Sequence, residues 1–149
     1  MKTESQTFHG QPTIYGQLHD RPPIDRDALL SSCMKNVSFA LSLVAELEAS
    51  GREQVDSIVR LVSNGQAELA AEAAHSLKGA AAIIGASALS ETAARLDAAA
   101  DGEEDCAELG VAHALRDEML RCLDYLPRLR ADLSAASFDG SFFQKNRVR

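Results

Sequence analysis

The hydrophobic positions of this chain recur at steps of three and four residues between Ile24 and Leu133. This spacing places apolar side chains on one face of an α-helix, and no stretch shows the two-residue alternation of a half-buried strand. The pattern therefore predicts an all-α protein. Four long amphipathic segments joined by short turns favour an antiparallel up-down four-helix bundle, preceded by a short helix that Asp25 caps.

Turn signals divide the pattern into these helices. The first long helix ends at Asn64-Gly65, and Ser50-Gly51 interrupts its apolar stripe, so we expect a bend or a split there. Gly85 ends the second helix, Asp101-Gly102 breaks the third, and Pro127 predicts a kink or an early end in the last. The expected core stripes are Ala70, Ala73, Leu77, Ala80, Ala81 and Ile84 in the second helix, and Ala112, Leu115, Met119, Cys122, Leu126, Leu129 and Leu133 in the last.

Both ends of the chain lack this periodicity. Residues 1–23 mix Gly, Pro, Gln, Thr and His and close with Arg21-Pro22-Pro23, which is typical of a flexible N-terminal segment. Residues 134–149 lose the helical period and carry Lys145, Arg147 and Arg149, so we expect a flexible basic C-terminal tail. The predicted folded domain spans residues 24–133.

The composition narrows the class of protein. A formal net charge of −7 without a basic stripe argues against a nucleic-acid partner. No apolar run approaches the roughly 20 residues of a membrane span, and the N-terminus lacks an apolar signal core, so we expect a cytoplasmic protein without membrane association. Cys33, Cys106 and Cys122 are widely spaced and are interpreted as small buried hydrophobes, so we expect no metal site and no cofactor.

His75 lies on the polar side of the second long helix. At about 100° per residue it falls nearly opposite the apolar stripe, so its ring should face water. Its neighbours on that face, Ala71, Gly79 and Ala82, are small, and Lys78 projects from the same side. An exposed imidazole can attack phosphorus through a nitrogen lone pair and later act as a leaving group, while Lys78 can offset charge on the phosphoryl oxygens.

Gly79 is unusual because it stands in the middle of this helix. A glycine there costs about 0.5–1 kcal/mol relative to alanine. Its place one turn after His75 makes sense if the backbone of another protein approaches closely; the alternative is that it lets two helices of this chain pack. The sequence contains no nucleotide-binding or phosphate-binding motif, so we expect the phosphoryl group to come from another protein.

The segment Ala74-His75-Ser76-Leu77-Lys78-Gly79-Ala80-Ala81, followed by Gly85-Ala86 and Leu89, resembles the signature of the histidine-containing phosphotransfer (HPt) domain family. The similarity is densest from Ala74 to Asp97. It implies a monomeric phosphorelay intermediate that lacks a kinase domain. Such a protein exchanges phosphate with the aspartates of response-regulator receiver domains and with a hybrid sensor histidine kinase, and Mg²⁺ would belong to the receiver.

The resemblance also implies roles for single residues. His75 would be phosphorylated, Lys78 would stabilise the charge of the phosphoryl group, and Asp97 on the next helix would orient the histidine. Asp97 is shorter than the Glu or Gln that is commoner there, and Ala80 and Ala81 stand where small hydroxyl residues often follow the glycine. A receiver domain would contact Ala71, Glu72, Lys78, Gly79 and Ala82.

Two other functions remain open at this point. The bundle could be a non-phosphorylated adaptor that binds signalling proteins, although the intact His75, Lys78 and Gly79 weigh against it. It could also be the dimerisation and phosphoacceptor segment of a sensor kinase. In such segments an acidic residue usually follows the histidine, whereas Ser76 follows His75 here.

Overall fold

A computed structural model describes the backbone of residues 21–99 and 105–147 and the side chains of residues 21–99 and 108–136. Over these residues the chain is all helical and forms no strand, which confirms the predicted fold class. Most of the predicted N-terminal segment and the expected break at Asp101-Gly102 lie outside the described residues. The helices are α3 (Arg26–Ser32), α4 (Val37–Ser63), α5 (Ala67–Ile84), α6 (Ser87–Ala99) and α7 (Asp105–Arg147).

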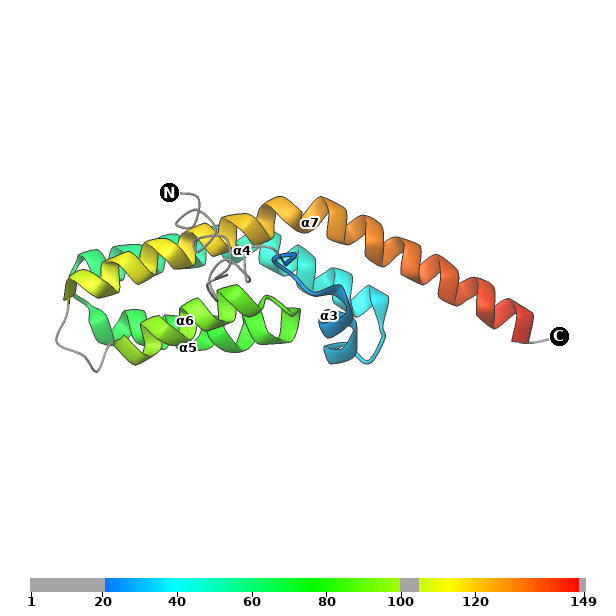
Figure 1. Ribbon diagram of the computed structural model, residues 1–149, viewed down its shortest axis with the longest axis horizontal. Helices are drawn as coiled ribbons and strands as arrows, with labels where there is room; N and C mark the ends of the chain where they lie inside the picture. Colours follow the sequence, from blue (N-terminus) through cyan, green and yellow to red (C-terminus); the bar gives the residue numbers. More distant parts are fainter. Residues whose placement is uncertain (1–20, 100–104, 148–149) are drawn as a thin grey trace, which may run out of the picture.

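The four longer helices run side by side and alternate in direction along the chain (Figure 1). α4 packs on α5, α5 on α6, α6 on α7, and α7 returns to pack on α4. In this arrangement α5 and α7 occupy opposite corners. The short α3 lies at the end of the four-helix bundle where α4 begins and α5 ends, and it contacts both helices and α7, which runs on past it (Figure 1).

The core follows the apolar stripes closely. All seven stripe positions predicted for α7 are buried, from Ala112 to Leu133. In α5 the buried positions are Ala70, Ala74, Leu77, Ala81 and Ile84, whereas Ala73 is half-buried and Ala80 is exposed. The buried side of α5 is thus turned towards Ala74, because α5 packs more extensively on α6 than on α4.

The expected split at Ser50-Gly51 is wrong, because α4 is continuous from Val37 to Ser63, whereas the alternative of a bend stays a prediction. Gly51 is buried at the contact between α4 and α7, where a Cβ atom would lie only 2.7 Å from the Sδ atom of Met119. The glycine therefore serves the close approach of two helices rather than a turn.

Pro127 lies inside α7, and the helix bends in its orange stretch instead of ending there (Figure 1). A proline removes one backbone hydrogen bond and crowds the preceding turn, which kinks a helix that tertiary contacts hold on both sides. α7 then continues past Leu133 to Arg147. The expectation that regular structure ends at Leu133 is therefore wrong for the backbone of residues 134–147, whereas the flexibility of this segment stays a prediction.

Cys33 and Cys122 are free and buried, as expected for small hydrophobes, whereas the Cys106 side chain lies outside the described part. Burial, with the nearby Glu118 carboxylate, raises the pKa of Cys122 to about 12, so its thiol stays protonated at neutral pH. Within the described residues, no single helix is both long and apolar enough to span a membrane. Only α3 and α4 taken together, bent by 112° at their junction, reach that length and composition.

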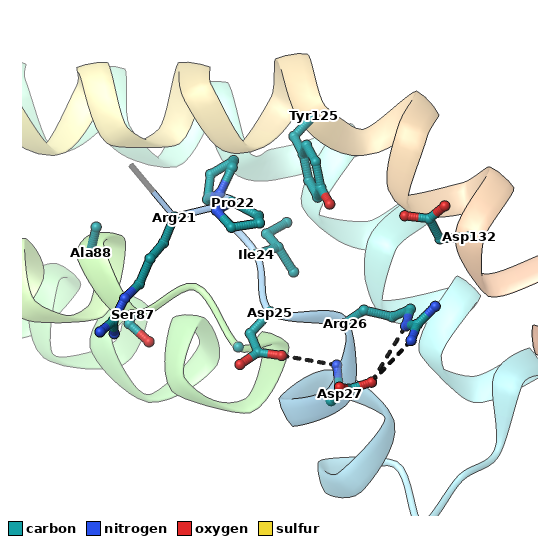
Figure 2. Close-up of a pocket in the computed structure, with 12 residues that line it drawn as sticks. Arg21, Pro22, Ile24, Asp25, Arg26, Asp27, Ser87, Ala88, Tyr125 and Asp132 are labelled. Carbon is teal, nitrogen blue, oxygen red and sulfur yellow. Dashed lines mark hydrogen bonds and ion pairs between the residues drawn. The ribbon is translucent and has the colours of Figure 1, made fainter. Parts of the chain in front are cut away.

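The turn between α5 and α6 is anchored to the start of α3. Gly85 adopts a φ of +85°, and its carbonyl accepts a 2.9 Å hydrogen bond from the backbone N–H of Asp25. The Asp25 carboxylate caps α3 by accepting from the N–H groups of Asp27 and Ala28, the former drawn in Figure 2. This connection ties the turn between α5 and α6 to the start of α3.

A cavity of about 400 Å³ opens beside this junction (Figure 2). Its walls include Arg21, Ser87, Tyr125 and Asp132. It lies at the start of α6, whereas Asp97 stands near the end of that helix, so the cavity does not belong to the face that carries His75.

We expect Gly85→Ala to destabilise the protein more than Gly65→Ala. Both glycines have positive φ, which costs a non-glycine residue about 1–2 kcal/mol. A Cβ at Gly85 would also lie 2.6 Å from the backbone oxygen of Asp25, whereas a Cβ at Gly65 meets nothing within 4 Å. Overpacking should add about 1–3 kcal/mol at Gly85, measured by denaturant unfolding. Equal losses in the two variants would contradict this account of the turn.

Candidate functional site

The His75 side chain stands on the outer face of α5 and is 67% exposed. Its Nδ1 atom lies 2.8 Å from Oδ2 of Asp97 on α6. An ionised carboxylate can only accept hydrogen bonds, so Nδ1 carries a proton and donates it. The lone pair of a neutral ring is then on Nε2.

Asp97 serves two donors at once. The Nζ atom of Lys78 lies 3.5 Å from the same Oδ2 that accepts from His75. The hydrogen bond from His75 lowers the pKa of Asp97, and partial desolvation opposes this. The electrostatic interaction with the His75 ring, together with the hydrogen bond and the charge of Lys78, lowers the pKa further. Asp97 is therefore an ionised acceptor at neutral pH, and both side chains are held close to it.

Small side chains explain how an aspartate reaches the histidine. On the side of α6 that packs against α5, Ala93 is buried and Ala94 is half-buried. On α5, the buried Ala74 and Ala81 likewise add little volume. Helix axes approach more closely when the contact residues are small. The short Asp97 side chain thus spans a gap that would otherwise require a longer residue.

Gly79 is exposed, and a Cβ atom built there would meet nothing within 4 Å. Among the described residues no other helix packs against it, so the alternative that Gly79 lets two helices of this chain pack is wrong. Around it, Glu72 and Ala82 are exposed, whereas Ala71 is half-buried. We call the surface formed by Ala71, Glu72, His75, Gly79 and Ala82 the α5 face.

A second exposed histidine, His113 on α7, differs from His75 in its surroundings. Its Nδ1 atom lies 3.2 Å from a guanidinium nitrogen of Arg116. A guanidinium can only donate, so Nδ1 of His113 is the acceptor, and in a neutral ring the proton is on Nε2. His75 and His113 thus present opposite tautomers, and His75 is the one whose Nε2 lone pair is free.

The family model of the Hpt domain matches residues 42–137, which is more than half of the chain. The chain belongs to the Hpt domain family. Hpt domains are phosphocarrier modules rather than kinases, and they act with receiver domains and histidine kinases in phosphorelay signalling. This confirms the family and the class of function that the sequence predicts. No curated protein and no solved structure matches the chain.

One contact beside the candidate site was not predicted from the sequence. The Ser90 hydroxyl of α6 donates a 3.0 Å hydrogen bond to the backbone carbonyl of Lys78 on α5. Ser90 precedes Asp97 by seven residues, which places both on one side of α6. The seven-residue spacing of Ser90 and Asp97 is visible in the sequence. It predicts a shared contact with α5 only once α5 is known to pack against that side of α6.

We expect carboxyl NMR to find a pKa for Asp97 below 3.8, the ordinary value of the group. Because folding depresses this pKa, the stabilising contribution of the carboxylate is present above about pH 3.8 and is lost as the pH falls through the folded-state pKa. His75→Ala should raise the pKa more than Lys78→Ala, since the hydrogen bond from His75 is the largest cause. A pKa that stays unchanged in His75→Ala would contradict the contact.

Proposed function

We infer that His75 accepts a phosphoryl group from the aspartyl phosphate of a receiver domain, as in a hybrid sensor histidine kinase, and passes it to another receiver domain. The observation that carries this proposal is the hydrogen bond between His75 and Asp97, which leaves Nε2 as the exposed nucleophile. The family match supports the class of reaction, and the geometry of α5 favours His75 as the residue.

The transfer step requires no group beyond these residues and the receiver. The Nε2 lone pair attacks phosphorus, an N–P bond forms, and the P–O bond to the receiver aspartate breaks, so that the aspartate leaves as a carboxylate. The proton on Nδ1 stays on the ring. The ring becomes positively charged as the N–P bond forms, and the Asp97 carboxylate beside Nδ1 stabilises that charge. The return step reverses these changes.

Lys78 supplies the second electrostatic contribution. Its ammonium is partly exposed and is paired at 3.5 Å with Asp97, a distance at which the contact is weak. A phosphoryl group on Nε2 of His75 offers additional anionic oxygens to this flexible side chain. We propose that Lys78 turns towards those oxygens during transfer while the Asp97 carboxylate continues to accept from Nδ1.

The α5 face is the proposed contact surface for the receiver. Its side chains are small around His75, and Gly79 leaves the ring open on one side. A monomer fits this proposal, because a partner copy on the α5 face would cover the nucleophile. A non-phosphorylated adaptor would require neither the orienting carboxylate nor an open Nε2, so this alternative is less well supported.

His75→Gln should abolish transfer from a phosphorylated receiver domain and leave helicity unchanged, because the side chain is exposed and supports no core contact. The measurement is radiolabel transfer from the phosphorylated receiver, with circular dichroism for the fold. The matched control is His113→Gln, which removes the second histidine of the described residues and should transfer like the parent protein. Undiminished transfer in a folded His75→Gln protein would exclude His75, and no transfer to the parent from any receiver would favour the adaptor.

Gly79→Ala should make the protein more stable but a poorer phosphoacceptor. Alanine at a mid-helix glycine raises the free energy of unfolding by about 0.5–1 kcal/mol, and nothing in this chain obstructs the methyl group. The methyl group would hold the receiver away from His75, so we expect transfer to slow roughly tenfold.

Gly110 provides the control for this variant. It is exposed on α7, which lies diagonally opposite α5, and a Cβ there also meets nothing within 4 Å. Gly110→Ala should therefore raise stability by a similar amount without slowing transfer. If Gly79→Ala and Gly110→Ala transfer at the same rate, Gly79 does not border the docking surface.

A further inference from the structure

Ser90 behaves differently from other hydroxyl residues in these helices. Ser42, Ser50 and Thr92 each donate to the carbonyl four residues earlier in their own helix, which is the usual local bond of such side chains. The Ser90 hydroxyl instead crosses to α5 and donates to the carbonyl of Lys78 at 3.0 Å. Its hydrogen bond joins two helices where the others stay within one.

The acceptor of this bond is placed beside the candidate site. Lys78 is the residue whose ammonium approaches Asp97, and it precedes Gly79, where the helix has no side chain to restrict it. A carbonyl oxygen has two lone pairs, so it can accept from Ser90 in addition to its partner within α5. The Ser90 hydroxyl thus fixes the α5 backbone at the position from which Lys78 projects.

The donor, Ser90, lies on the same side of α6 as Asp97, the partner of His75. Ser90 and Asp97 lie two turns apart on one side of α6, separated by about 10 Å along the axis. The two residues hold α6 against α5 at two levels: Ser90 at the backbone of Lys78, and Asp97 at the imidazole of His75. Between those levels Ala93 and Ala94 offer no bulky side chain that would set the register by shape.

We propose that Ser90 is a positioning residue that sets the register of α6 on α5, so that Asp97 meets Nδ1 of His75. The predicted effect of Ser90 on phosphoryl transfer rests on the proposed function of His75. Its effect on the orientation of the His75 ring does not. Without the Ser90 hydrogen bond, α6 can shift along the small side chains of α5. The Asp97 side chain is too short to keep its contact with His75 after such a shift.

The test compares Ser90→Ala, Ser90→Thr and Ser42→Ala in the full-length chain. Ser90→Thr keeps the hydroxyl, and Ser42→Ala removes a hydroxyl that bonds only within α4. In Ser90→Ala we expect nitrogen NMR to show a smaller share of the Nδ1-protonated tautomer of His75. The pKa of Asp97 should rise towards its ordinary value. Transfer from a phosphorylated receiver should slow about fivefold, less than the roughly 100-fold cost of a 1 Å misplacement.

Ser90→Thr should restore all three signals, and Ser42→Ala should change none of them. A Ser90→Ala protein that melts at a lower temperature but keeps the parent His75 tautomer and Asp97 pKa would show a merely structural bond and overturn the proposal. So would a folded Ser90→Thr protein that fails to restore them. If the parent chain takes no phosphate from any receiver, the proposed function fails, but the two NMR measurements still decide the role of Ser90.

Discussion

The separation of α5 and α6 is the constraint on which the candidate site depends. Asp97 carries its carboxylate on a single methylene, so a 2.8 Å contact with His75 exists only if the two helices lie close together. Small side chains permit that closeness, because α5 and α6 pack extensively on each other and Ala74, Ala81 and Ala93 are all buried. These alanines add little buried surface to the core. They do, however, let the Asp97 carboxylate reach His75, the candidate phosphoacceptor, and fix its tautomer.

The electrostatics of the site follow from sharing one carboxylate between the imidazole N–H of His75 and the ammonium of Lys78. Asp97 neutralises Lys78 and orients His75 through the same oxygen, so neither partner has to be buried to be held. In the proposed transfer, exposure matters because an aspartyl phosphate must reach Nε2 from solvent. The arrangement would keep the proposed nucleophile both oriented and accessible, whereas a buried ring would be oriented but out of reach.

The sequence predicts those features that depend on one helix alone. The apolar stripe of α7, the Asp25 cap, the Gly85 turn and the outward position of His75 all follow from residues close to one another in the chain. Features that depend on two helices were harder to predict from residue spacing, although the resemblance already pointed to Asp97 as the partner of His75. Gly51 carries the local signature of a helix break, and only Met119 on α7 shows that it is a packing position. Likewise, the periodicity of α6 places Asp97 on a face but does not give its distance from His75.

Three glycines show how a role in the fold of the protein can be distinguished from a role in contact with a partner. Gly85 needs a backbone conformation that other residues resist, and Gly51 needs the space that a side chain would fill. Gly79 has a helical backbone and open space around it, so neither reason applies, yet it still carries the cost of a mid-helix glycine. A residue that weakens its own helix without a benefit inside the molecule indicates a benefit outside it. Under the proposed function, its position one turn from His75 places that benefit where the receiver domain approaches.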